Sequence, residues 1–353
     1  MTSVPARGEV FLAETREQPQ ALLRLLEQAP AYHDVARAAV ERKPQIVRLV
    51  GHGSSDNAAS YGVYAFGIAA GWTALRDSIS LSVYYGAELD LERSVVVALS
   101  QSGRTPDVVA YVERAKERGA LTIAVTNDPG SELARAADMR LPLMAGPESA
   151  VAASKTYVNQ LAALMLLAGT IAGRTDEVVD EIGRAAESMA EALPGFEDAV
   201  ASVAGAFAYV GRMYVIGRGI EFATAREIAL KLTETCRVAA EPLTSTDLAH
   251  GPIAALDPLF PVWTIASNDE TLPTIIEAAK RARTAGATIV ASGNAQSKIE
   301  GAAYRLPVPE APSALLSPLL SVVPGQLFAG ALATAKGLDS DHPVGLTKVT
   351  LAQ

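Results

Sequence analysis

Two carboxylates and one lysine on a single predicted helix have the types and the spacing to move a proton. Glu227, Lys231 and Glu234 stand at positions i, i+4 and i+7, so they share one face of a helix. A carboxylate placed in this way can carry a proton between adjacent carbon atoms. The same spacing is typical of a solvated ladder of surface ion pairs, and spacing alone leaves both interpretations open.

A histidine follows the same region of the chain and adds a group that titrates near neutral pH. His250 stands between Ala249 and the turn-forming pair Gly251-Pro252, where an imidazole can be presented to a ligand. A structural or capping histidine fits the sequence equally well. His52 lies within a glycine-containing loop, where it could contact a ligand.

Two loops rich in serine and glycine could bind a compact anion. Each follows a predicted strand and precedes a helix, a place where backbone amides point outward and hydroxyl groups can add hydrogen bonds. The candidate phosphate ligands are Gly53, Ser54, Ser55, Ser100, Gln101, Ser102 and Thr105. Such residues also make ordinary turns and helix caps, so one loop alone would be ambiguous, but two together favour a ligand.

Several other site chemistries lack their sequence signatures. The loop at Gly51-His52-Gly53 has no third glycine of a dinucleotide fingerprint, and no Lys-Ser/Thr pair ends a phosphate loop. HExxH, CxxC and paired aspartates are also absent, and no GxSxG elbow surrounds Ser54 or Ser102. We therefore expect no metal and no cofactor.

The elements that position these residues follow an alternating pattern. Apolar strands are predicted at 46–50, 95–99, 121–125 and 140–143, with helices after them, the last being a long apolar helix over about 153–171. Continuous apolar strands alternating with helices indicate a parallel sheet covered on both faces. The predicted fold class is therefore α/β, with flavodoxin-like, doubly wound sheets.

The pattern repeats in the second half of the chain. Predicted strands at 213–216, 262–266, 288–291 and 304–308 follow the same order, so we expect two modules. A polar connector over 174–201 joins them, and a helix break is predicted within it at Pro194-Gly195. We predict an N-terminal helical segment over 1–30, module 1 over 31–175, a helical connector over 176–200, module 2 over 201–340 and an active-site tail over 341–353.

Length, charge and cysteine content agree with a globular protein in a reducing compartment. The chain has 353 residues, 49% of them hydrophobic and 20% charged, and a formal net charge of −9. This charge disfavours nucleic acid as a partner. Cys236 is the single cysteine, the N-terminal residues show no signal peptide, and the apolar run 161–172 is too short to span a membrane. We expect a cytoplasmic protein with no membrane partner.

Five motifs in order resemble the sugar isomerase (SIS) family of phosphosugar-binding proteins. They cover nearly the whole chain. The motifs are Ser-Gln-Ser-Gly-Arg-Thr-Pro-Asp at 100–107, Ala-Val-Ala-Ala-Ser-Lys at 150–155, Glu-Ile-Ala-Leu-Lys-Leu at 227–232, Ala-His-Gly-Pro at 249–252 and Gly-Leu-Thr-Lys at 345–348. Within the family, the chain resembles SIS-type glucosamine-6-phosphate deaminases and the isomerase half of glucosamine-fructose-6-phosphate aminotransferase.

The resemblance implies roles for individual residues. Ser55, Ser100, Gln101, Ser102 and Thr105 would bind the phosphate of a small sugar phosphate, with Val151 and Ala152 near the sugar. Glu234 would move the C1/C2 proton, His250 would assist ring opening, Lys348 would reach the open-chain carbonyl, and Lys231 and Glu227 would orient the site. The family further implies a homodimer in which the His250 loop is shared between subunits.

The activity implied by this resemblance is deamination of glucosamine 6-phosphate to fructose 6-phosphate and ammonia. The chain shows no glutaminase domain in its sequence, so glutamine is not expected to be a nitrogen donor. Two alternatives stay open. One is a deglycase for fructosamine-type 6-phosphates, and the other is a regulator that binds phosphosugars without catalysis.

Overall fold

The computed structural model describes residues 7–348 and divides them into two compact units. The N-terminal unit consists of Gln18–Glu148 and Lys155–Ala186. The C-terminal unit, within the described range, consists of residues 7–17, Ser149–Ser154 and Glu187–Lys348. Residues 1–6 of the predicted N-terminal segment and residues 349–353 of the predicted tail lie outside the described residues.

The N-terminal unit is built on a parallel sheet of five strands in the order β2-β1-β3-β4-β5. The strands are β1 (Ile46–Val50), β2 (Ala74–Arg76), β3 (Ser94–Ser100), β4 (Leu121–Thr126) and β5 (Met139–Pro142). Every residue of β3 and β4 is buried, because helices cover both faces of the sheet. This strand order places a topological switch point between β1 and β3, where doubly wound proteins bind ligands.

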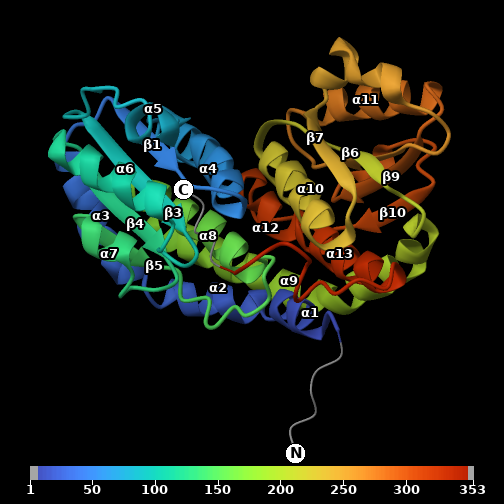
Figure 1. Cartoon of the computed structure of the whole chain (residues 1–353), viewed down its shortest axis with the longest axis horizontal. Helices are drawn as coiled ribbons and strands as arrows, with labels where there is room; N and C mark the ends of the chain where they lie inside the picture. The colour runs from blue at the N-terminus through green and yellow to red at the C-terminus, as the bar shows by residue number, and fades with distance from the viewer. Residues whose placement is uncertain (1–6, 349–353) are drawn as a thin grey trace, which may run out of the picture. The chain divides into compact units, whose positions relative to one another are not determined.

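Helices form a layer on each side of this sheet (Figure 1). One layer contains α2 (Gln18–Leu26), α3 (Ala29–Glu41), α4 (Ser54–Tyr64), with a π-helical turn at Ala65–Ala69, and the long α8 (Lys155–Ile171). The other contains α5 (Ile79–Val83), α6 (Pro106–Glu117) and α7 (Glu132–Ala136). Tyr111 and Val112 of α6 pack against Val96 and Ala98 of β3 in the core of the second layer.

The C-terminal unit repeats the same topology, with a parallel sheet in the order β10-β9-β8-β6-β7. Its strands are β6 (Arg212–Gly217), β7 (Ala239–Thr244), β8 (Pro261–Ile265), β9 (Thr288–Gly293) and β10 (Tyr304–Pro307). Its α-helices are α1 (Glu9–Arg16), α10 (Phe222–Cys236), α11 (Leu272–Thr284), α12 (Ser317–Ser321) and α13 (Val323–Ala335). Figure 1 shows α11 and α13 on opposite sides of this sheet.

These two sheets confirm the predicted fold class. Ile46–Val50 forms a strand over the predicted range, and the other predicted strands shift by no more than two residues at either end. The edge strands β2 and β7 were not predicted, since β2 has only three residues and β7 contains a proline and a glutamate. Helix α4 begins at Ser54, so Ser54 and Ser55 belong to its first turn.

The predicted break at Pro194-Gly195 is wrong. Helix α9 runs without interruption from Thr175 to Ala204 and carries Pro194 in its interior. A proline removes one backbone hydrogen bond, but Met189, Phe196 and Val200 continue the buried face of the helix on both sides of it. Burial of this face outweighs the lost hydrogen bond.

One helical stretch, Ala314–Ala335, is long and apolar enough by composition to cross a membrane. Within the structure, however, 89% of its most apolar window is buried. Leu327 and Phe328 of this stretch are almost inaccessible to solvent. The stretch therefore serves as the core helix of the C-terminal unit.

Candidate functional site

The first serine-rich loop connects β1 to α4 in a tight turn. Gly53 has a φ angle of 56°, a left-handed conformation that glycine adopts without strain. A side chain at Gly51 would come within 2.9 Å of the Cβ atom of Ser55, so only glycine fits there. Ser54 starts α4 and Ser55 is 7% exposed. The turn therefore places two hydroxyl groups at the N-terminus of a helix, an end that favours anions.

The second loop connects β3 to α6 and lies at the same edge of the sheet, because β1 and β3 are parallel neighbours. Ser100 Oγ accepts a hydrogen bond from the Gly103 amide at 3.1 Å and lies 3.3 Å from Thr105 Oγ1. Ser102 Oγ accepts from the Arg104 amide at 3.3 Å. The two loops together form what we call the cradle, which consists of residues 51–55 and 100–105 of the N-terminal unit.

Two side chains that the sequence analysis did not select support the cradle. Gln160 of α8 is 1% exposed and donates from Nε2 to Ser55 Oγ at 2.8 Å. This bond occupies a lone pair of Ser55 and leaves its own hydrogen for donation to an anion. Asp107, in the first turn of α6, lies 2.7 Å from Nε2 of His52, whose ring stays largely exposed. A polar residue inside the apolar helix 153–171 was the signal that could have pointed to Gln160.

Glu227, Lys231 and Glu234 form a cluster on α10 in the C-terminal unit. Lys231 Nζ lies 3.4 Å from Glu227 Oε1 and 2.5 Å from Glu234 Oε2. The side chains of Glu227 and Lys231 are fully buried, whereas that of Glu234 is 23% exposed. A solvated surface ladder is therefore excluded for Glu227 and Lys231. Buried charges of this kind are tolerated only when they are paired, and Lys231 bridges both carboxylates.

Glu234 borders a cavity of about 380 Å³ in the C-terminal unit. The walls come from the last turns of α10 and from the chain after α13. The lining residues are Leu230, Thr233, Glu234, Thr235, Arg237, Leu338, Asp339, His342, Pro343, Val344 and Leu346. Of the clustered residues on α10, Glu234 is thus the one with access to a space that a small molecule can enter. This position suits a group that exchanges a proton with a ligand.

The segment Ser149–Ser154 and the C-terminal tail are bound to each other within the same unit. Lys348 Nζ donates to the carbonyl oxygen of Ala150 at 2.7 Å, and the Val151 amide donates to the carbonyl oxygen of Asp341 at 3.0 Å. Ala152 is buried and Val151 is half-buried. The structure therefore brings Lys348 together with the segment that contains Val151 and Ala152.

Acidic side chains anchor this arrangement. Glu14 of α1, only 6% exposed, accepts hydrogen bonds from the amides of Ser149 and Ala150. The Asp341 carboxylate accepts from the amides of Gly8 at 3.0 Å and Phe11 at 2.7 Å, at the start of α1. A carboxylate at this end of a helix is favourable because of the free amides there. The tail up to Lys348 is therefore held by helix α1.

His250 ends a short 3-10 helix, Asp247–His250, that follows β7. Its side chain is exposed, and Gly251 after it has a φ angle of 132°, which favours glycine. The imidazole is thus presented to solvent rather than packed in the core. Its catalytic role stays a prediction.

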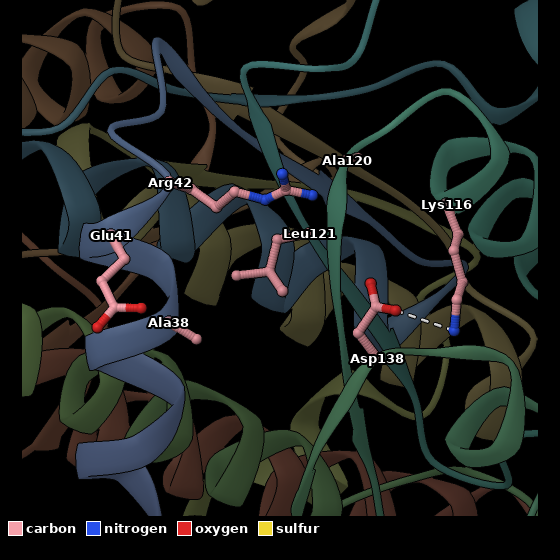
Figure 2. Close-up of a pocket in the computed structure, with 7 residues that line it drawn as sticks. All are labelled: Ala38, Glu41, Arg42, Lys116, Ala120, Leu121 and Asp138. Carbon is pink, nitrogen blue, oxygen red and sulfur yellow. Dashed lines mark ion pairs between the residues drawn. The ribbon is translucent and has the colours of Figure 1, made fainter.

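A second depression of the N-terminal unit, about 410 Å³ in volume, lies at the opposite ends of the strands, where β4 and β5 begin (Figure 2). Two of its charges pair with each other: Asp138 lies 2.9 Å from Lys116 and also accepts from Thr122 Oγ1 at 2.8 Å. Burial acts to raise the pKa of Asp138, but the bonds from Lys116 and Thr122 lower it overall. Parallel sheets bind ligands at the carboxyl ends of their strands, so the cradle is the better candidate.

Within residues 7–348, no group of three or more His, Cys, Asp or Glu side chains is arranged to hold a metal ion. Cys236 is a buried thiol that donates to the carbonyl oxygen of Ala329 at 3.0 Å. Burial raises the pKa of this thiol to about 11, so it stays protonated at neutral pH. Cys236 is therefore a core residue rather than a nucleophile.

Two parallel sheets with the same strand order, one of them carrying a polar cradle at its switch point, define a doubly wound α/β protein with two modules. The family model of the SIS domain matches residues 42–169 and 207–336, so that each sheet lies within one match. The chain therefore belongs to the SIS domain family, and the predicted family is confirmed.

Named relatives give this family membership more detail. The chain is 32% identical over 360 residues to the isomerizing glutamine–fructose-6-phosphate aminotransferase of Shewanella oneidensis, covering 96% of this chain and 58% of that enzyme. A second aminotransferase of this name, from Aeropyrum pernix, is 36% identical and is covered over 57% of its length. The chain thus spans less than three fifths of these curated relatives.

Solved structures share the fold over nearly the whole chain. The C-terminal domain of the Francisella tularensis glucosamine-fructose-6-phosphate aminotransferase superposes with a TM-score of 0.84 at 25% identity, covering 95% of this chain and 98% of that domain. Glucosamine-6-phosphate deaminase from Thermotoga maritima superposes with a TM-score of 0.76 at 22% identity, covering 97% of this chain and all of that one (100%). At the latter identity, the likeness supports the fold alone.

Proposed function

We propose that the chain is an enzyme that converts glucosamine 6-phosphate and water into fructose 6-phosphate and ammonia. The observation that carries this proposal is the cluster on α10, in which buried Lys231 bridges Glu227 and the partly exposed Glu234. A non-catalytic sugar sensor has no need for a buried lysine that orients a carboxylate beside a cavity. The names of the aminotransferase relatives support an amino-sugar phosphate as substrate.

The proposed reaction uses the two sets of residues for different tasks. The hydroxyls and amides of the cradle would hold the phosphate, and His250 would assist ring opening. Glu234 would remove the proton from C2 and return it to C1, which turns the C2 amine into an imine. Water would then hydrolyse this imine, so that the nitrogen leaves as ammonia and oxygen takes its place at C2. Lys348 would bind the C1 oxygen of the open-chain sugar.

The test is ammonia release from glucosamine 6-phosphate, with fructose 6-phosphate detected in the same reaction. Glu234→Gln should lower turnover by about 100-fold or more, because general acid–base catalysis typically contributes that much. Its affinity for the sugar phosphate should stay nearly unchanged, since the cradle is intact. Glu191→Gln, an exposed position on α9, is the matched control and should keep full activity. No ammonia from the unaltered protein would refute the proposal.

A deglycase for fructosamine-type 6-phosphates is the second candidate, and the cavity beside Glu234 favours it. This space of about 380 Å³ contains Arg237 in its wall and could accept an amino acid attached to the sugar nitrogen. Glu234 would then move a proton in the opposite direction, from C1 to C2, which turns the C1 amine into an imine. Water would hydrolyse this imine, so that the amino acid leaves and an aldose 6-phosphate remains. Comparing turnover of glucosamine 6-phosphate with that of a fructosamine 6-phosphate decides between the two.

We also propose a homodimer in which the exposed His250 serves the site of the partner subunit. The test combines two inactive variants, His250→Ala and Glu234→Gln, by refolding them together. Random pairing would place one intact site in each mixed dimer and restore about a quarter of full activity, because half of all dimers are mixed. No recovery from correctly folded, mixed dimers would contradict a shared site.

A further inference from the structure

A carboxyl group of the C-terminal unit is buried among hydroxyl groups and takes no part in the proposed reaction. Glu221, 1% exposed, ends a 3-10 turn (Gly219–Glu221) that leads into α10. Its Oε1 accepts hydrogen bonds from Ser267 at 2.5 Å, Ser317 at 2.7 Å and Ser321 at 2.9 Å. Its Oε2 accepts from Thr224 at 2.5 Å. Four hydroxyl donors compensate the cost of burying this group.

Glu221 occupies the position in the C-terminal unit that Ser55 occupies in the N-terminal unit. Gly51 follows the first strand of one sheet and Gly217 ends the first strand of the other, and in each turn a second glycine, Gly53 or Gly219, stands two residues later. The second glycines of the two turns have nearly the same φ angle, 56° at Gly53 and 59° at Gly219. A Cβ atom on Gly51 would lie closest to Ser55, and a Cβ atom on Gly217 would lie closest to Glu221. In both turns, the obstructing residue is the fourth after the glycine.

The partners of these two residues also correspond. Strand register pairs Val50 with Ala98 in one sheet and Ile216 with Thr264 in the other, which makes Ser267 the counterpart of the cradle residue Gln101. The helix after the fifth strand supplies a hydrogen-bonding contact in each unit. That contact is Gln160 to Ser55 in the N-terminal unit, and Ser317 and Ser321 to Glu221 in the C-terminal unit.

The two corresponding positions, Ser55 and Glu221, differ in the size of the side chain. Ser55 is short and uncharged, so it brings no anionic group of its own to its loop. Glu221 is longer and brings its own anionic group to the hydroxyl donors. Beside them remains a space of about 30 Å³, lined in part by Ser267 and Ser317. Such a space holds about two water molecules at most, which is too little for a phosphate group.

We propose that the C-terminal unit contains a second anion cradle that is closed by the carboxylate of Glu221, and that removing this carboxylate opens a site for a small oxyanion. The donors Ser267, Ser317 and Ser321 remain when Glu221 is shortened, and they are the type of group that binds phosphate. In the natural chain, the cradle of the C-terminal unit is therefore closed to phosphate. This inference goes beyond the proposed reaction and does not depend on it.

The experiment measures binding of inorganic phosphate to the full chain in a background that lacks the first cradle. Ser100→Ala with Ser102→Ala removes cradle hydroxyls and should abolish stabilisation by phosphate. Adding Glu221→Ala to this background should restore it, with a rise in Tm of roughly 3 °C or more at saturating phosphate. Calorimetry should give one phosphate per chain for the natural protein and two for Glu221→Ala alone. Sodium chloride at equal ionic strength serves as the salt control.

Glu221→Gln is the matched control variant, because it keeps the size of the side chain and fills the same space. It should show no response to phosphate in the altered background. Glu221→Ser, which installs the residue type of the first cradle, should respond as Glu221→Ala does. The proposal is overturned if both shortened variants fold and bind no more phosphate than Glu221→Gln, or if neither folds even when phosphate is present. If the natural protein binds no phosphate while Glu221→Ala does, the proposed reaction fails and this inference stands.

Discussion

Helices α4 and α10 follow the first strand of their units in the same topology, yet they carry different chemistry. The N-terminal turn of α4 contributes Ser54 and Ser55 to the cradle, while the buried residues that follow, such as Tyr61, carry no charge. The corresponding turn before α10 is closed by Glu221, and the interior of α10 holds Glu227 and Lys231 instead. One scaffold thus supports a candidate anion site in one unit and a buried charge cluster in the other. Side-chain choice at a few positions, rather than topology, separates their tasks.

The largest effect is expected from breaking the charge cluster that α10 carries and α4 does not. Lys231→Met leaves Glu227 buried without its cation and should lower the free energy of unfolding by about 3–5 kcal/mol. The double variant Glu227→Gln/Lys231→Met removes both charges and should recover much of this stability, but not turnover. Urea unfolding with an activity assay measures both. Equal stabilities of the single and double variants would show that Lys231 does not pair with Glu227.

A smaller effect is expected from the turn that shapes the cradle. Gly103 has a φ angle of 63°, and a Cβ atom there would lie 2.8 Å from Thr126 Oγ1 and closer still to Ser131. Gly103→Ala should therefore cost about 1–3 kcal/mol of stability and weaken phosphate binding. Gly173→Ala, where φ is 75° and a Cβ atom would meet no neighbour, is the control. It should cost stability without weakening phosphate binding.

A still smaller effect is expected from the support behind Ser55. Gln160→Leu removes the 2.8 Å hydrogen bond and should weaken phosphate binding by about 5- to 10-fold, which corresponds to one neutral hydrogen bond of about 1 kcal/mol. Combining it with Ser55→Ala should add little, since both changes act through the same hydroxyl. Calorimetric titration of the four proteins with inorganic phosphate measures this. Additive losses would mean that Gln160 acts independently of Ser55.

The smallest effect is expected at the far edge of the N-terminal sheet. The lowered pKa of Asp138 contributes stability above its unfolded pKa, and this contribution is lost as the pH falls through the folded value. Asp138→Asn should therefore cost no more than about 1 kcal/mol near neutral pH, and the difference should vanish in acid. Urea unfolding midpoints of the natural protein and of Asp138→Asn, measured between neutral pH and about pH 3, test the direction of this pH dependence. A difference that grows in acid would contradict it.

Sequence patterns predicted the buried centre of each sheet well. Continuous apolar runs such as Val95–Leu99 in β3 have few alternatives to a strand covered on both faces. Short or polar edge strands carry no such pattern, so β2 and β7 escaped prediction. The break at Pro194 was wrong because local preference yielded to burial of the helix on both sides of it.

By itself, the sequence determined the family, the fold class and the serine-rich loops, because these rest on residue order and local periodicity. The tertiary structure decided which polar groups are buried and what they contact. Spacing could not tell whether Lys231 lies in solvent or between two carboxylates, nor that Gln160 reaches Ser55. Nor could spacing show that Glu221 accepts hydrogen bonds from Ser317 and Ser321, which follow it by 96 and 100 residues in the sequence. Burial and long-range contacts set the energies of these groups, and both arise only when distant segments pack together.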